Sequence, residues 1–127
     1  MTGMAESTEH RHHAIDYVEL TVTDLAEAKR FYADAFGWEF NDYGVDYAGI
    51  RDGSGASASE VGGLRAGTEV RPGGPLVLLY SADLDQTLAA VTSAGGRVVD
   101  GPYGFPGGRR FHFQDTSGNE LGVWSEG

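Results

Sequence analysis

The side chains best suited to chemistry gather on two short segments in which polar and apolar residues alternate. In the first, residues 17–22 (YVELTV), Tyr17, Glu19 and Thr21 share one face, because successive side chains of a strand point to opposite sides. A carboxylate between Tyr17 and Thr21 in a partly apolar setting can have a raised pKa and act as a base without a metal, so Glu19 is the candidate catalytic residue. The alternative is an ordinary ion pair, for which the expected partners of Glu19 are Arg51, Arg109 and Arg110.

The second segment, DTSGNELGVWS at residues 115–125, is a polar turn that leads into a strand. Alternation places Glu120, Gly122 and Trp124 on one face. Gly122 has no side chain, so we expect it to open room for a ligand beside Trp124. His112 lies in the preceding run, without a serine or acid partner at a recognisable motif spacing, and a catalytic triad is therefore not expected.

Aromatic rings near these segments favour a surface for a planar or glycosylated molecule, and acidic residues at its rim would favour a cation. The alternative is that some of these rings only fill the space between two sheets, as we expect of Phe36, Trp38 and Phe40. The expected ligand-binding residues are Tyr17, Thr21, Tyr47, Leu76, Leu78, Tyr80, His112, Gly122 and Trp124.

An internal repeat supplies the elements that position these residues. Residues 17–40 (YVELTVTDLAEAKRFYADAFGWEF) match residues 76–99 (LVLLYSADLDQTLAAVTSAGGRVV) at an offset of 59 residues without a gap. Each copy opens with a strand and enters a helix, with Asp24 and Asp83 as the expected N-caps. Glycines at 37 and 95–96 provide the left-handed stop that a helix end favours.

Short strand-like runs follow each helix, at 38–43, 46–51 and about 57–64, and again at 97–99, 109–114 and 120–125. The order βαβββ, repeated, predicts an α+β fold with two modules, about 14–66 and 75–126. Neither module can cover its own sheet, so we expect one domain over residues 14–127. The glycine-rich stretch YGFPGGRRF at 103–111 predicts a hairpin at the mouth of the site, either a flap over a ligand or an ordinary turn.

The composition of the chain excludes several classes of protein. The chain has 127 residues, 40% of them hydrophobic, and no cysteine, which excludes disulfides and thiolate chemistry. Its formal charge of −10 argues against nucleic acid as a partner, and no apolar run is long enough to span a membrane. Residues 1–13, which include His10, His12 and His13, lack a hydrophobic signal core and are expected to be a flexible tail of a cytoplasmic protein.

TDLAEAKRFYADAFGWEF, followed much later by FQDTSGNELGVWS, resembles the glyoxalase/bleomycin-resistance/extradiol-dioxygenase group, the vicinal-oxygen-chelate superfamily, over about residues 14–126. The resemblance implies cupped mixed sheets with helices outside and ligands on the concave side. It also implies a divalent ion held by His, Glu or Gln side chains. In this chain the corresponding positions carry residues without such groups, namely Tyr17, Gly63, Leu76 and Gly122.

We therefore expect a protein that binds a small organic molecule in an aromatic-lined cup, without a cofactor and as a homodimer. One alternative is a metal-dependent lyase, isomerase or dioxygenase with a shifted site built from Glu19, His112 and Glu120. Glu60 is a further candidate only if a bulge turns it toward Gly63. The other alternative is a metal-independent enzyme that uses Glu19 as its base.

Overall fold

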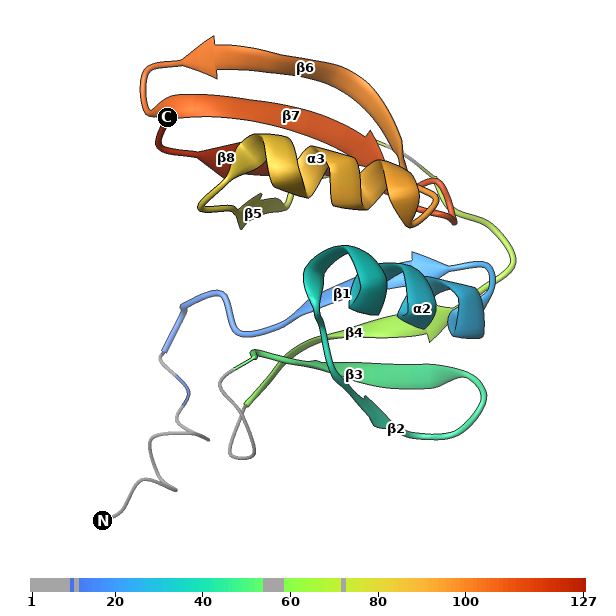
Figure 1. Ribbon diagram of the computed structural model, residues 1–127. Helices are drawn as coiled ribbons and strands as arrows, with labels where there is room; N and C mark the ends of the chain where they lie inside the picture. Colours follow the sequence, from blue (N-terminus) through green and yellow to red (C-terminus); the bar gives the residue numbers. More distant parts are fainter. Residues whose placement is uncertain (1–9, 11, 54–58, 72) are drawn as a thin grey trace.

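A computed structural model describes residue 10 and residues 12–53, 59–71 and 73–127 of the chain (Figure 1). The order βαβββ occurs twice, and each copy forms one four-stranded sheet. The first sheet has the strand order β1-β4-β3-β2 and the second β5-β8-β7-β6. The elements are β1 (Val18–Val22), α2 (Leu25–Phe36), β2 (Phe40–Asp42), β3 (Tyr47–Arg51), β4 (Glu60–Ala66), β5 (Leu78–Tyr80), α3 (Leu84–Ser93), β6 (Arg97–Phe105), β7 (Gly108–Gln114) and β8 (Glu120–Ser125).

Both sheets are mixed and follow the same pairing rule. The first strand of each copy runs parallel to the last one, as β1 does to β4 and β5 to β8, and the other pairs are antiparallel. This pattern is the α+β architecture that the repeat predicts.

The helix boundaries follow the local signals in the sequence. Asp24 accepts a hydrogen bond from the backbone N–H of Glu27 at 2.9 Å, and Asp83 caps α3 in the same way. Gly37 adopts φ 73° at the end of α2, a left-handed conformation that a residue with a side chain rarely adopts. Gly95 has the same role after α3, with φ 107°.

One hydrophobic core joins the two copies. Helices α2 and α3 lie next to each other on one side of the sheets (Figure 1). Phe31 of α2 packs against Phe113 of β7, with ring centroids 6.1 Å apart, and both rings are buried. Phe36, Trp38 and Phe40 pack against this core but are only partly buried.

Several strand boundaries differ from the expected ones. β1 begins at Val18 rather than residue 17, and β6 extends to Phe105, well beyond residue 99. The stretch 103–111 is therefore mostly paired strand with a tight turn between Phe105 and Gly108, because β6 and β7 remain in register to that point. Most of the expected tail, and residues 54–58 of a loop and strand, lie outside the described residues. Within the described part, no helix is long and apolar enough to cross a membrane.

Candidate functional site

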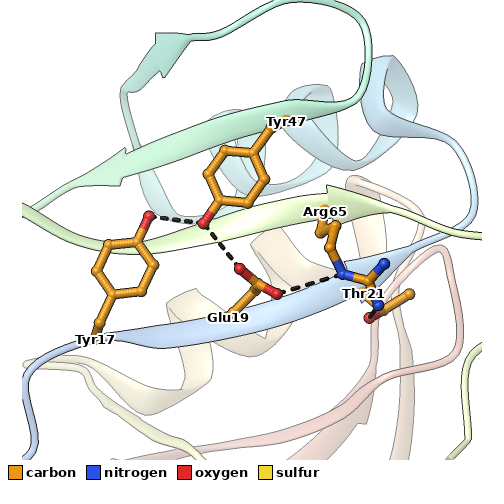
Figure 2. Close-up of polar contacts among 5 residues, drawn as sticks. All are labelled: Tyr17, Glu19, Thr21, Tyr47 and Arg65. Carbon is orange, nitrogen blue, oxygen red and sulfur yellow. Dashed lines mark hydrogen bonds and ion pairs between the residues drawn. The ribbon is translucent and has the colours of Figure 1, made fainter.

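The face of the first sheet that points away from the helices carries a chain of hydrogen bonds. Tyr17 and Tyr47 join their hydroxyl groups at 2.7 Å, and the Tyr47 hydroxyl donates to Glu19 Oε1 at 3.1 Å (Figure 2). Thr21 lies on the same face of β1. The expected grouping of Tyr17, Glu19, Thr21 and Tyr47 is thus present in the structure.

The arginine that pairs with Glu19 differs from all three expected ones. Arg65 Nε lies 3.3 Å from Glu19 Oε2, and Arg65 Nη2 donates to Thr21 Oγ1 at 3.1 Å (Figure 2). The register explains this choice, since β1 and β4 are parallel neighbours and Thr21 lies opposite Arg65. Glu19 is therefore a paired carboxylate, as the alternative interpretation expected, although with a different partner.

Glu60 joins this face through a bulge. The register between β3 and β4 shifts at the start of β4, which turns Glu60 toward the tyrosines. Its carboxylate accepts hydrogen bonds from Tyr17 at 3.0 Å, Tyr43 at 2.7 Å and Asn41 at 3.0 Å. The bulge that the sequence analysis required before Glu60 could be a candidate is therefore present.

Protonation states on this face follow from these contacts. Partial burial and hydrogen bonds to Tyr47 and Glu60 raise the pKa of Tyr17 far above its usual range, so this phenol is a donor at neutral pH. Burial also raises the pKa of Tyr47, together with its bond to Glu19. For Glu60, burial acts to raise the pKa, but the three donors outweigh it and the net pKa is lowered.

The glycine positions do not leave empty space. A Cβ atom built on Gly63 would lie 1.9 Å from the Tyr47 hydroxyl, and one on Gly49 would lie 2.1 Å from Glu60 Oε1. The side chains of Tyr47 and Glu60 therefore lie directly over these two glycines. A larger residue at either position would displace the hydrogen-bonded cluster.

The prediction that Gly122 opens room for a ligand is wrong. A Cβ atom on Gly122 would lie 2.5 Å from Leu78 Cδ2, so Leu78 fills the space that was expected to receive a ligand. The two residues are opposite each other across the parallel β5–β8 pair. Leu76 approaches the same position, with its Cδ2 atom 3.7 Å away.

Next to Leu78, the same face presents a row of aromatic rings. Trp124 makes an edge contact with Tyr80, with centroids 5.1 Å apart, and another with Phe105 at 6.3 Å. Tyr80 is 57% exposed and Trp124 is half-buried, so the rings are accessible from one side. The guanidinium carbon of Arg110 lies 5.4 Å from the ring centroid of Phe105.

His112 has polar partners that no sequence motif indicated. Its Nδ1 atom lies 2.9 Å from Glu120 Oε2, and its Nε2 atom lies 2.8 Å from the Tyr103 hydroxyl. Arg110 Nε donates to that same hydroxyl at 2.5 Å. Glu120 and His112 come from adjacent antiparallel strands. Tyr103 comes from β6, a strand that the sequence analysis expected to end at residue 99.

The expected site residues therefore form two separate sets. Tyr17, Glu19, Thr21 and Tyr47 lie on the first sheet, and the remaining residues lie on the second. Among the described residues, no hydrogen bond, ion pair or ring contact joins one set to the other. Sequence reasoning missed Arg65 and Tyr43. It placed Tyr103 and Phe105 only within a hairpin at the mouth of the site, and it named Arg110 only as a partner of Glu19, although alternation in β7 places Arg110 on the face of His112.

These residues do not fit the divalent ion that the resemblance implies. Of the four corresponding positions, two are glycines covered by Tyr47 and Leu78, and Leu76 has no donor atom. The shifted alternative is not assembled within the chain either, since Glu19 lies on the first sheet while His112 and Glu120 lie on the second. Over the described residues, no group of three His, Asp or Glu side chains is arranged to hold a metal.

A separate apolar cavity opens on the helix side of the sheets. It has a volume of about 490 Å³, and none of the expected ligand-binding residues lines it. Its apolar lining consists mainly of Val18, Leu20, Phe36, Trp38, Ile50, Val61, Val77, Leu79 and Leu121. The cavity is therefore an alternative binding site for an apolar ligand. Because Trp38 lines it, the fluorescence of Trp38 would report a ligand bound there.

Comparison with known proteins agrees with the fold and with the resemblance. The model of a family described as "Glyoxalase/Bleomycin resistance protein/Dioxygenase superfamily" matches residues 14–123. CFP32 of Mycobacterium tuberculosis is 29% identical over 129 residues, which cover 95% of this chain and 49% of that protein. The chain thus spans about half the length of this curated relative.

Two solved structures illustrate the range of proteins with this fold. A glyoxalase-related enzyme from Fulvimarina pelagi superposes with a TM-score of 0.73 at 18% identity, covering 89% of this chain and 88% of that one. TnmS3, an antibiotic binding protein from Streptomyces sp. CB03234, superposes with a TM-score of 0.66 at 25% identity, covering 93% and 100%. At 18% identity, the likeness to the first concerns the fold alone.

Proposed function

The chain belongs to the glyoxalase/bleomycin resistance protein/dioxygenase superfamily, and from that premise we propose that it binds a small planar organic molecule against the second sheet, without a catalytic metal. The observation that carries this proposal is the row of accessible rings formed by Tyr80, Trp124 and Phe105. Rigid aromatic side chains with a few placed polar groups are typical of sites for small organic ligands. The likeness to an antibiotic binding protein gives further support.

Binding is favoured over catalysis because three of the four positions at which the resemblance implies metal ligands, Gly63, Leu76 and Gly122, have no side-chain donor atom. Leu76 and Gly122 offer only apolar atoms and backbone, and Leu78 covers the glycine. Glu19, the candidate base, already accepts from Tyr47 and pairs with Arg65. An engaged carboxylate is a poorer base than a free one of raised pKa.

Intrinsic fluorescence tests the proposal, because the chain has two tryptophans, one at each competing location. In the Trp38→Phe variant the tryptophan fluorescence comes from Trp124 alone, and in Trp124→Phe it comes from Trp38 alone. Titration with planar polycyclic probes such as anthraquinones and naphthalenes should quench Trp124, with Kd in the range of about 1–100 μM. Quenching of Trp38 alone would place the ligand in the apolar cavity and contradict the proposal.

Turnover of a probe would instead support one of the two enzymatic alternatives. Activity that disappears with EDTA and returns with zinc, nickel, manganese or ferrous ion would favour a metal-dependent enzyme. Activity that survives EDTA but is lost in Glu19→Gln would favour a metal-independent one. Metal content is measured on a variant with His10, His12 and His13 replaced by alanine, and about one ion per chain would overturn the metal-free part of the proposal.

We also propose that the protein is a homodimer in which a second copy of the chain covers the apolar surface beside the exposed rings and leaves the ligand site open. Leu76 and Leu78 are exposed in the single chain, which leaves an apolar surface in contact with water. Light scattering after gel filtration should give twice the monomer mass of 13.5 kDa. A monomer at micromolar concentration would contradict this part of the proposal.

A further inference from the structure

We propose that the ligand of the second sheet is an aromatic anion, such as an aromatic carboxylate or phenolate, and that Arg110 binds its charged group. This inference rests on the proposed function and adds the chemical class of the ligand and the residue that selects it. It is carried by the placement of Arg110, by the absence of a carboxylate partner, and by the hydrogen bonds that fix its orientation.

Two rings hold the guanidinium group of Arg110 in place. Its central carbon lies 5.4 Å from the ring centroids of both Tyr103 and Phe105, and the side chain is half-buried. Arg110 also lies directly opposite Trp124 across the β7–β8 pair. Directly opposed residues on one sheet face are about 4.5–5.5 Å apart at Cβ, so a ring stacked on Trp124 would bring its substituent to Arg110.

Arg110 has no carboxylate within ion-pair distance among the residues that the structure describes. Four of the seven described arginines pair with a carboxylate, and of the other three Arg30 and Arg97 are exposed whereas Arg110 is half-buried. A half-buried cation without a counter-ion is costly unless a ligand supplies the charge. The described arginines paired with carboxylates are Arg51 with Glu39, Arg65 with Glu19, Arg71 with Glu69, and Arg109 with Asp85.

The hydrogen bonds around Tyr103 have one consistent direction. In the tautomer with the proton on Nδ1, His112 donates to the Glu120 carboxylate and its Nε2 atom accepts from the Tyr103 hydroxyl. The Tyr103 oxygen then accepts from Arg110 Nε. This chain uses one N–H of the guanidinium and leaves its terminal nitrogens available for the paired hydrogen bonds that a carboxylate accepts.

Two carboxylates near this face oppose the binding of an anion. Both are held by hydrogen bonds, since Glu120 accepts from His112 and Glu126 accepts from the Tyr80 hydroxyl at 3.3 Å, so neither pairs with Arg110. The long-range field of the acidic chain is screened beyond about 8 Å at physiological salt. The direct contact with Arg110 therefore decides whether the charged group binds.

The test compares 2-naphthoate with its neutral isostere 2-naphthamide in the wild-type protein and three variants, by titration calorimetry and by quenching of Trp124. The variants are Arg110→Gln and, as a matched control, Arg109→Gln. Both remove one positive charge at adjacent positions, but Arg109 pairs with Asp85 of α3 and is not part of the chain around Tyr103. Tyr103→Phe, which keeps the ring and the charge, measures the contribution of the orienting hydrogen bond.

In the wild-type protein, 2-naphthoate should bind at least ~10-fold more tightly than 2-naphthamide, as expected for a paired hydrogen bond between charged groups. Arg110→Gln should abolish this preference while 2-naphthamide still binds, which also shows that the face remains folded. Arg109→Gln should change either affinity by less than about twofold, and Tyr103→Phe should weaken 2-naphthoate alone, by a few-fold.

Equal affinity for the two probes in the wild-type protein would overturn the inference while leaving the proposed function standing. An equal loss in Arg109→Gln and Arg110→Gln would also overturn it, because net charge rather than contact would then be responsible. If neither probe nor any other planar compound bound, the proposed function itself would fail.

Discussion

At the scale of single residues, two positions at which the resemblance implies metal ligands belong to a cluster of hydrogen-bonded groups. Tyr17 occupies one of these positions, and its hydroxyl bonds to Tyr47 and Glu60. Gly63, at another, lies under the Tyr47 hydroxyl. The first sheet thus carries a polar cluster at these positions, and its stability is expected to depend on pH.

Glu60→Gln should reveal that dependence. The pKa of Glu60 is lowered in the folded protein, so its stabilisation is complete above the unfolded pKa of about 4.3 and is lost as the pH falls through the lower folded pKa. The variant should lose about 1 kcal/mol in free energy of unfolding at pH 7. It should also show a shallower loss between pH 5 and 3 than the wild type in urea unfolding.

Glu69→Gln is the matched control, since the carboxylate of Glu69 is exposed and pairs only with exposed Arg71. It should follow the wild-type curve. Identical acid profiles for Glu60→Gln and the wild type would show that the cluster does not stabilise the fold through that carboxylate.

At the scale of elements, the parallel β5–β8 pair shows how a side chain of one strand limits the size of the residue on the neighbouring strand. Gly122 is buried because Leu78 of β5 lies over it. A glycine in a strand costs conformational entropy, so the packing of Leu78 must compensate for it. The two positions are expected to be energetically coupled.

Gly122→Ala should destabilise the protein by about 1–2 kcal/mol, because the new methyl group overlaps Leu78. In a Leu78→Ala background the same substitution should be neutral or stabilising, by up to about 1 kcal/mol, since the clash is gone and the entropic benefit remains. A double-mutant cycle in urea measures the coupling. Additive effects would mean that Leu78 does not fill the position.

At the scale of the whole molecule, the two copies are tied together by buried contacts. Tyr32 of α2 donates to Asp115 Oδ2 at 2.9 Å in the second copy, and both residues are buried. Asn119 Nδ2 donates a hydrogen bond to the backbone carbonyl oxygen of Thr21 in the first copy at 2.7 Å. With a shared core as well, the copies should fold as one cooperative unit.

Unfolding of Trp38→Phe and Trp124→Phe, each with one tryptophan in a different copy, tests this cooperativity. In each variant, tryptophan fluorescence and far-ultraviolet circular dichroism should give the same denaturant midpoint. Adding Tyr32→Phe should lower the free energy of unfolding by about 1–3 kcal/mol, because buried Asp115 loses a donor, and both copies should respond equally. Separate transitions, or an effect limited to Trp38, would contradict one cooperative unit. Tyr80→Phe is the control, since it removes the hydroxyl of an exposed tyrosine outside the buried contact.

The sequence by itself determined the elements and the faces of this protein, because both depend on local chemistry. Capping at Asp24, the left-handed turn at Gly37 and alternation along β1 and β8 concern neighbouring residues, and each is read correctly from spacing. The family resemblance, carried by the motifs at both ends, is confirmed for the same reason.

Only the tertiary structure decided which side chains meet, because the register between strands and the bulge at the start of β4 depend on packing across the sheet. Arg65 rather than Arg51, Arg109 or Arg110 pairs with Glu19, since β1 and β4 are neighbours. Gly122 offers no space, because a residue 44 positions earlier fills it. The chain from Glu120 to Arg110 needs Tyr103, from a strand whose length no local signal predicted.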